Sequence, residues 1–194
     1  MQDFLFRLGT AVVIGANDPV AETIATKFAD RGSRVVQGRS WGDALAQLDP
    51  GSEVHTFVAL ARTRTPDIGA LLDLLTAVLP RLRHAQGSVL VVTSSQCASE
   101  TKGDLDEVLR EIAAIERAHG VRVNQVVAGH LADDLLALDM PPESRLTGTL
   151  ADVAEAVCFL ASDRAGYISG QCLAVNGGAP TGERRAKVDA ARSG

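Results

Sequence analysis

Aromatic side chains are scarce in this sequence of 194 residues, at 4% of the total, and Tyr167 is its single tyrosine. Positive charge is not in excess either, because 19 lysines and arginines stand against 24 acidic residues, a formal net charge of −5. A nucleic acid or an anionic membrane surface rewards a basic face on its protein partner. We therefore expect neither of them as a partner of this chain.

Cysteines are few as well: Cys97, Cys158 and Cys172 are the three present, and no two have the C-x-x-C spacing. This pattern predicts neither a disulfide framework nor a zinc site, and none of the four histidines has a suitably spaced ligand partner. No apolar run approaches the roughly 18 residues that cross a bilayer, and the N-terminus does not resemble a secretory signal. We expect a cytoplasmic protein with free thiols and no metal.

Apolar residues are abundant, at 46%, which suits one domain with a core of its own. Short β-branched runs predict strands at 10–16, 33–37, 54–61, 88–93, 121–127 and 171–175. Amphipathic stretches between them predict helices at 18–31, 41–48, 66–84, 102–119 and 150–162. This alternation predicts an α/β fold, a Rossmann-like doubly wound parallel sheet of about six strands. We expect one domain over residues 1–178 and a polar, flexible tail over 179–194.

Two phrases in the second half of the chain are characteristic. Gly120-Val-Arg-Val-Asn-Gln-Val-Val-Ala-Gly129 is one, and Tyr167-Ile-Ser-Gly-Gln-Cys-Leu-Ala-Val-Asn-Gly-Gly178, which follows a helical stretch, is the other. They resemble the phrases G-I-R-V-N-x-V-x-P-G and I-T-G-Q-x-L-x-V-D-G-G of the short-chain dehydrogenase/reductase family. The resemblance covers residues 9–178. It implies a shortened version of the family fold, without one strand–helix unit after Arg39 and with a short substrate lid between Gly129 and Asp152.

The resemblance implies a dinucleotide site at the turn after the first strand, where the family has T-G-x-x-x-G-x-G. Here Gly15 stands at the first glycine, but Pro19 and Ala21 replace the other two. Asp18 places a carboxylate near the position of the phosphates. Like charges about 4 Å apart cost roughly 1–4 kcal/mol at effective dielectric constants of 80 to 20. The turn therefore predicts weak binding of NAD(P), or none.

The candidate cofactor contacts are Gly15, Asn17, Asp18 and Arg39. Asn17 or Asp18 has a simpler interpretation as the N-cap of the following helix. Arg39 follows the second strand, where NADP-dependent members of the family carry a basic residue, although a plain surface arginine is the alternative. After the third strand, the family phrase N-N-A-G is replaced by a stretch that ends in Ala61-Arg62, which favours packing over a nicotinamide.

The family transfers hydride with a tyrosine acid/base, whose pKa of about 10 is lowered by a nearby lysine. Alignment of the family pattern places Ser95 at its serine and Lys102 at its lysine, but Ala98 at its tyrosine and Asp67 at its asparagine. Tyr167 lies before the last strand and cannot replace the missing phenol. We therefore expect no catalytic residue, with Ser95 and Lys102 as vestiges.

The helices that span Leu71–Leu82 and Leu105–Ile115 carry apolar stripes that are wider than one face against a sheet requires. In the family these helices and the last strand form subunit interfaces. The sequence therefore predicts a non-catalytic subunit that supports a full-length, active short-chain dehydrogenase in a hetero-oligomer.

The partner would oxidise a hydroxyl group or reduce a keto group of its substrate. A carrier-bound acyl group is one of the substrates considered. Such subunits occur in β-hydroxyacyl dehydrogenases of aminocoumarin biosynthesis, which is a secondary metabolism, and of aromatic-succinate degradation. Two alternatives stay open: an autonomous NAD(P)-dependent oxidoreductase that uses Ser95 and Lys102, and an NADP-binding module without chemistry.

Overall fold

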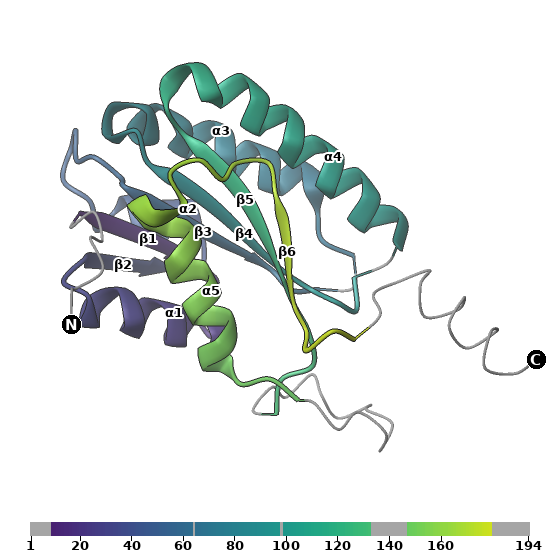
Figure 1. The fold of residues 1–194 in the computed structure, drawn as a ribbon. Helices are drawn as coiled ribbons and strands as arrows, with labels where there is room; N and C mark the ends of the chain where they lie inside the picture. The colour runs from purple at the N-terminus through teal and green to yellow at the C-terminus, as the bar shows by residue number, and fades with distance from the viewer. Residues whose placement is uncertain (1–8, 64, 98, 133–146, 180–194) are drawn as a thin grey trace, which may run out of the picture.

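The strands form one sheet in the computed structural model, which describes residues 9–63, 65–97, 99–132 and 147–179 (Figure 1). They are β1 (Thr10–Ile14), β2 (Arg34–Gly38), β3 (Thr56–Ala61), β4 (Ser88–Ser94), β5 (Arg122–Ala128) and β6 (Cys172–Val175). All pairs are parallel, in the order β2-β1-β3-β4-β5-β6. The predicted six-stranded Rossmann-like sheet is confirmed. Most of the predicted short lid (133–146) and of the tail (180–194) lies outside the described residues.

Helices cover both faces of the sheet. They are α1 (Pro19–Asp30), α2 (Trp41–Leu45), α3 (Ile68–Ala85), α4 (Ser99–Glu116) and α5 (Leu150–Ala161), with 3-10 turns at Arg117–His119 and Asp163–Ala165. Helices α1 and α5 pack on one face, and α2, α3 and α4 pack on the other (Figure 1). Among the described residues, no helix is long and apolar enough to cross a membrane.

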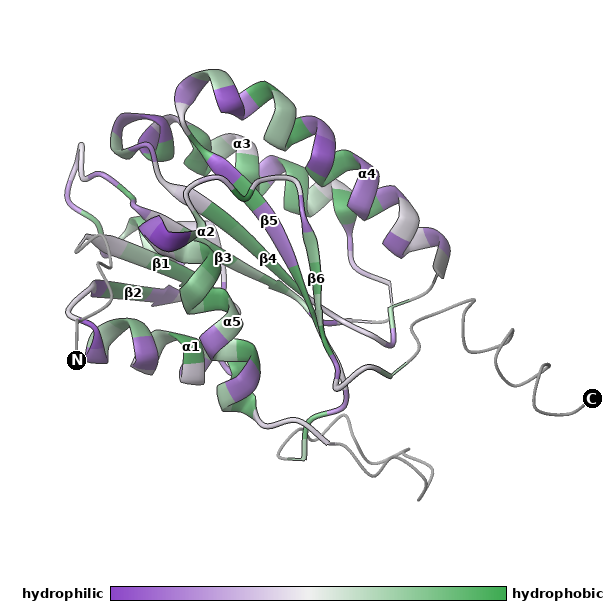
Figure 2. Ribbon diagram, viewed as in Figure 1, coloured by the Kyte–Doolittle hydropathy of each residue, from purple (hydrophilic) through white to green (hydrophobic). Residues whose placement is uncertain are grey.

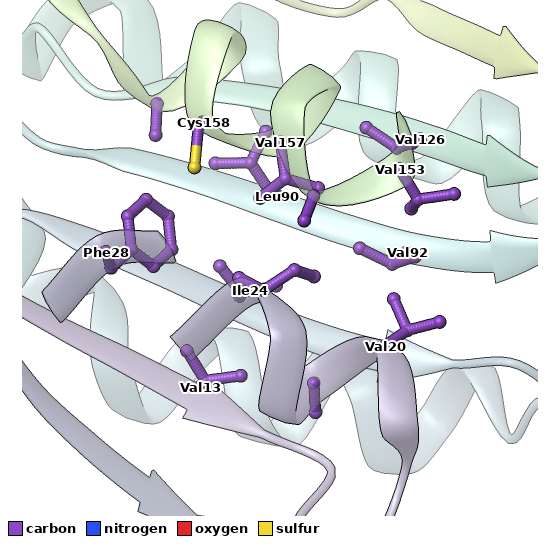
Figure 3. Packing of buried hydrophobic residues seen from close by; sticks show 14 of the residues in the cluster. Val13, Val20, Ile24, Phe28, Leu90, Val92, Val126, Val153, Val157 and Cys158 are labelled. Atoms are coloured by element: carbon purple, nitrogen blue, oxygen red, sulfur yellow. The ribbon is translucent and has the colours of Figure 1, made fainter. Parts of the chain in front are cut away.

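Two apolar layers enclose the central strands. On the α1/α5 face, Ile24 and Phe28 of α1 lie against Leu90 of β4 and against α5 (Figure 3). The opposite face of the sheet presents alternate strand residues to α3 and α4, among them Phe57 and Val91. In Figure 2 the central strands β1, β3 and β4 are mostly hydrophobic, whereas β2, β5 and the helices also carry hydrophilic residues. Strands that are buried on both faces read as continuous apolar runs, which is why their positions could be predicted.

The phrase around Arg122 and Asn124 ties three elements together. The Arg122 guanidinium donates hydrogen bonds to the carbonyls of residues 160–162, at the end of α5. The Asn124 amide donates to the Ile168 carbonyl at 2.9 Å and accepts the Gln171 N–H at 3.1 Å. A cation at a helix C-terminus stabilises the fold, and so does a buried side-chain amide that makes two hydrogen bonds. This family-like phrase therefore holds α5 and β6 to β5.

Candidate functional site

The strand order reverses at β1, because β2 lies on one side of it and β3 on the other. In open α/β sheets, ligands bind outside the carboxyl ends of the strands at such a reversal. The segments that meet there are the turn after β1, the end of β2 at Gly38 and the residue after β3, Arg62. This is the place where the sequence predicts the remains of a dinucleotide site.

Backbone N–H groups of the turn after β1 are bonded to carbonyls of β2 and of the turn itself. The N–H groups of Gly15 and Ala16 donate to the Gly38 carbonyl at 3.0 and 3.2 Å, and the Asp18 N–H donates to the Gly15 carbonyl at 2.9 Å. Gly15 has φ +133°, and a Cβ there would lie 2.9 Å from Cβ of Leu60. The glycine is therefore needed to pack the turn on β3, and these N–H groups already serve the protein.

Asp18 is the N-cap of α1, and its Oδ1 accepts the Val20 N–H at 2.8 Å. Pro19 at the first helical position has no N–H to offer. The neighbouring Asn17 is exposed and has φ +84°, a left-handed conformation that asparagine tolerates. Of the two residues that the sequence offers as caps, the structure selects Asp18. An external anion would have to displace its carboxylate from the helix N-terminus.

Arg62 is the residue of this site that sequence reasoning missed. Its Nη1 lies 2.7 Å from Oδ1 of Asp18, and its side chain is only 3% exposed, against 23% for Asp18. The signal that could have revealed the pair is the position of opposite charges at the carboxyl ends of β1 and β3, which are neighbours in a doubly wound sheet. The carboxylate at the helix N-terminus is thus neutralised within the chain by a buried guanidinium.

A bound dinucleotide needs free N–H groups at a helix N-terminus and room for its pyrophosphate against the glycine turn. Here the Asp18 carboxylate occupies the helix N-terminus, and the Arg62 side chain is buried beside it. Leu60 lies against the turn at Gly15. These residues do not fit a pyrophosphate in the arrangement that the structure shows.

Arg39 follows β2 on the same side of the sheet and is exposed. Its Nε lies 3.8 Å from Oδ2 of Asp43, and its own N–H donates to the same oxygen at 3.2 Å. Asp43 belongs to the short helix α2, so Arg39 is held by an exposed, local ion pair. An exposed pair of this kind contributes little to stability.

Ser95 and Lys102 lie beyond β4. Ser95 is half-buried in the turn that follows the strand, and its N–H donates to the Ala128 carbonyl at 2.7 Å. Lys102 is half-buried near the start of α4. Burial raises the pKa of the Cys97 thiol, and the charge of Lys102 opposes that rise. The charge of Lys102 therefore acts on a thiol, whereas the family resemblance would have it act on a phenol.

The other two family positions carry no acid/base group of the expected kind. Asp67 is the N-cap of α3, and its Oδ1 accepts the Ala70 N–H at 3.0 Å. Position 98 lies outside the described residues, so Ala98 is known from the sequence alone. Among the described residues, no group of three His, Cys, Asp or Glu side chains could hold a metal ion.

Tyr167 is fully exposed at the opposite end of the sheet. The segment that follows it is anchored at the start of β5, where the Gly170 N–H donates to the Val123 carbonyl at 2.7 Å. The Ser95 turn is bonded to Ala128 at the other end of the same strand. At about 3.3 Å per residue the two ends are roughly 16 Å apart. The single tyrosine therefore cannot act with Ser95.

The apolar surface differs from the sequence-based prediction on α3. Five of its large apolar side chains are buried within the chain itself, namely Leu71, Leu75, Val78, Leu79 and Leu82. The second apolar face on this helix is thus smaller than predicted, because the sheet and neighbouring helices cover most of it. Large exposed apolar side chains are found instead at Ile115 of α4 (65% exposed), Phe159 of α5 (38%) and Leu173 of β6 (38%).

Comparison with known proteins identifies relatives over most of the chain. The family model described as enoyl-(acyl carrier protein) reductase matches residues 61–180. The cis-4-hydroxycyclohexanecarboxylate dehydrogenase of Sinomonas cyclohexanicum is 30% identical, over 88% of this chain and 86% of its own. Subunit BbsC of the (2S)-[(R)-hydroxy(phenyl)methyl]succinyl-CoA dehydrogenase of Thauera aromatica is 30% identical, over 84% of this chain and 82% of its own. The match to protein FixR of Bradyrhizobium diazoefficiens, at 31% identity, spans only 44% of that protein.

A solved structure has the same fold. It is a 7α-hydroxysteroid dehydrogenase in complex with NADH and 7-oxoglycochenodeoxycholic acid, and it superposes with a TM-score of 0.75 over 92% of this chain and 96% of its own. The sequence identity is 19%, so this likeness concerns the fold alone.

Proposed function

Because the chain belongs to the short-chain dehydrogenase/reductase family, we propose that it is a non-catalytic subunit of a heteromeric enzyme of that family. Its role is to support a full-length, active partner that oxidises or reduces a hydroxyl or keto group. The observation that carries the proposal is the Asp18–Arg62 ion pair, which lies at the reversal of strand order where the family resemblance implies a dinucleotide site.

The first line of support is the poor fit of a cofactor. The structural neighbour holds NADH, but in this chain a pyrophosphate would compete with Asp18 for the Val20 N–H and for the Arg62 guanidinium. Because the Arg62 guanidinium is already paired with the Asp18 carboxylate, its charge contributes little attraction to a phosphate. We therefore propose that NAD(P) binds this chain weakly or not at all.

The second line of support is the missing acid/base. Hydride transfer at a carbonyl needs a group that donates or accepts a proton beside the substrate. The family's tyrosine is replaced by Ala98, and Tyr167 lies at the other end of the sheet. Ser95 and Lys102 alone supply a hydroxyl and a cation, but no phenol whose pKa the lysine could lower.

The third line of support concerns assembly. By its name, the relative BbsC is a subunit of a dehydrogenase. In this chain β6 is an edge strand whose first three residues are exposed. Leu173 of β6 pairs in register with Val126, so it faces the α5 side, where Phe159 is also partly exposed. Exposed edges and apolar patches are typical of interaction surfaces.

We propose that the partner packs on β6 and α5, and on the helices that carry Leu71–Leu82 and Leu105–Ile115. On these helices, Ile115 is the large apolar side chain that is most available to a partner.

The test is to purify this chain alone and together with a full-length dehydrogenase that is encoded beside it. Molar mass, NADH and NADPH binding, and turnover are measured for each sample. We expect a hetero-oligomer whose turnover is unchanged when Ser95→Ala or Lys102→Ala is made in this chain. The matched substitutions of serine and lysine in the partner are expected to abolish turnover.

Two results would contradict the proposal, and each favours one alternative. Turnover by this chain alone, lost in Ser95→Ala and in Lys102→Ala, would make it an autonomous NAD(P)-dependent oxidoreductase. Saturable NADP binding by a homo-oligomer without turnover, weakened by Arg39→Gln, would make it an NADP-binding module.

A further inference from the structure

A cavity of about 530 Å³ lies at the amino ends of β5 and β6, at the opposite end of the sheet from the Asp18–Arg62 pair. It is bounded by the C-terminal part of α4 on one side and by the segment 166–171 on the other. Its size is within the range of small-molecule sites in proteins, about 300–1,000 Å³. Neither the candidate dinucleotide contacts nor Ser95 and Lys102 line this cavity.

The cavity is hollow because small residues line it. Ala113 and Ala114 of α4 face the glycines of the opposite segment, and a Cβ on Gly170 would lie 3.6 Å from Cβ of Ala113. Gly170 has φ +74°, a conformation that side chains rarely adopt, so this wall stays without a side chain. Val121 adds a further apolar surface. Between Arg110 and Arg117, the α4 residues that line the cavity are thus the two alanines alone.

Positive charge is concentrated around this apolar interior. Arg110, Arg117 and Arg122 line the cavity, and among the described residues that line it none is acidic. This is notable in a chain whose net charge is −5. Arg110 and Arg117 are both exposed, and neither has an ion-pair partner within the described part of the chain. Their seven-residue separation places them on one helical face, about 10 Å apart along the axis.

Aromatic surface is available at the same place. Tyr167 lines the cavity, and its side chain is fully exposed to solvent. An exposed phenol ring offers a flat apolar surface to a planar ligand. The guanidinium groups of arginine match the two oxygens of a carboxylate. Apolar walls, an aromatic ring and two exposed guanidinium groups therefore converge on one volume.

We propose that this cavity is a binding site for a small organic carboxylate with an aromatic or alicyclic body. The carboxylate binds Arg110 or Arg117, and the ring lies between the alanine face of α4 and Tyr167. Arg110, Ala113 and Ala114 belong to the helix of Leu105–Ile115, so a partner seated on that helix would cover the site. The binding proposal therefore concerns the chain without its partner, and it is tested on that form.

The single tyrosine gives a direct measurement. Full-length protein labelled with 3-fluorotyrosine contains one ¹⁹F resonance, from position 167. The probes are 2-naphthoate and the neutral 2-naphthalenemethanol, which has the same ring system. We expect a saturable shift with naphthoate and at least about tenfold weaker binding of the alcohol, because one charge-assisted contact contributes that factor or more.

Matched variants separate charge from shape. Arg110→Gln/Arg117→Gln should weaken naphthoate binding at least about tenfold, whereas Arg34→Gln, an exposed arginine on β2, should leave it unchanged. Ala114→Phe fills the cavity from an exposed position and should abolish the shift while both arginines remain. Urea midpoints verify that each variant is folded.

Three results would overturn the proposal. They are the absence of a saturable shift with naphthoate in the unmodified sequence, equal binding of the alcohol, and an equal loss of affinity in Arg34→Gln.

Discussion

Replacement of Asp18 by asparagine removes the charge from the Asp18–Arg62 pair and keeps a side chain that caps helices well. The side-chain oxygen of the asparagine can still accept the hydrogen bond from the Val20 N–H, so the substitution isolates the ionic contribution of the pair. Loss of one partner of a fully buried ion pair costs about 3–5 kcal/mol. Arg62 is 3% exposed but Asp18 is 23% exposed, so water screens part of the interaction. We expect Asp18→Asn to lower the free energy of unfolding by about 2–4 kcal/mol.

Arg62→Met should cost less, because the Asp18 carboxylate that remains is nearer to water and still accepts the Val20 N–H. The double variant removes both charges and should be less destabilised than the sum of the single variants. We expect a coupling energy of about 2 kcal/mol from the double-mutant cycle. Because the pair is largely buried, added salt should change this coupling little.

Urea unfolding is followed by the fluorescence of Trp41, the single tryptophan, whose ring lies 6.2 Å from that of Phe57 in the core. The dependence of the unfolding free energy on urea should stay constant across the variants. Asp49→Asn is the control: it breaks the exposed Arg34–Asp49 pair and should cost less than about 0.5 kcal/mol. A coupling energy for Asp18 and Arg62 below about 0.5 kcal/mol would refute the reasoning.

Two further outcomes are expected. The hydrogen bond from Arg83, 2.8 Å at its Nε, lowers the pKa of the buried Glu116 carboxyl below its ordinary 4.5. Glu116→Gln should therefore lower the unfolding free energy by about 1–3 kcal/mol at pH 7. The difference in unfolding free energy between the two proteins should vanish as the pH falls from 4.5 through the lowered pKa, because the wild-type carboxylate is then protonated. Urea midpoints at pH 7 and pH 3 measure this difference. An equal difference at both pH values would contradict the prediction. Burial raises the pKa of the Cys158 thiol to about 11, so a disulfide reagent at pH 8 should modify the exposed Cys172 first and Cys158 only after unfolding; mass spectrometry of partly modified protein is the check.

The fold could be predicted from the sequence because its signals are local. Each strand begins and ends within two residues of its predicted range. Parallel strands that are buried on both faces are short β-branched runs, and these are visible without knowledge of tertiary contacts. The start of α1 was likewise signalled by Asn17-Asp18-Pro19, although which residue caps the helix had to come from the structure.

The candidate site was only partly predictable, because its decisive contact joins residues 44 positions apart. The sequence shows a carboxylate after β1 and an arginine after β3, but their pairing depends on the order of strands in the sheet. How far the chain itself covers the apolar stripe on α3 was unpredictable for a related reason. Its width suggested a second buried face, but how much of a helix its own chain covers is set by packing around it, which periodicity does not measure.

The turn after β1 carries an anion, Asp18, and its counter-charge is Arg62, the residue after β3. An enzyme that relies on its coenzyme for part of its stability survives longer when that coenzyme is plentiful, since a ligand that binds only the folded state shifts the folding equilibrium by mass action. In this chain Asp18 and Arg62 balance each other's charge at the helix N-terminus, so we expect added NAD(P) to leave its stability unchanged. Under the proposed subunit role, its lifetime in the cell should follow the supply of the partner subunit and be indifferent to the redox state of the nucleotide pool.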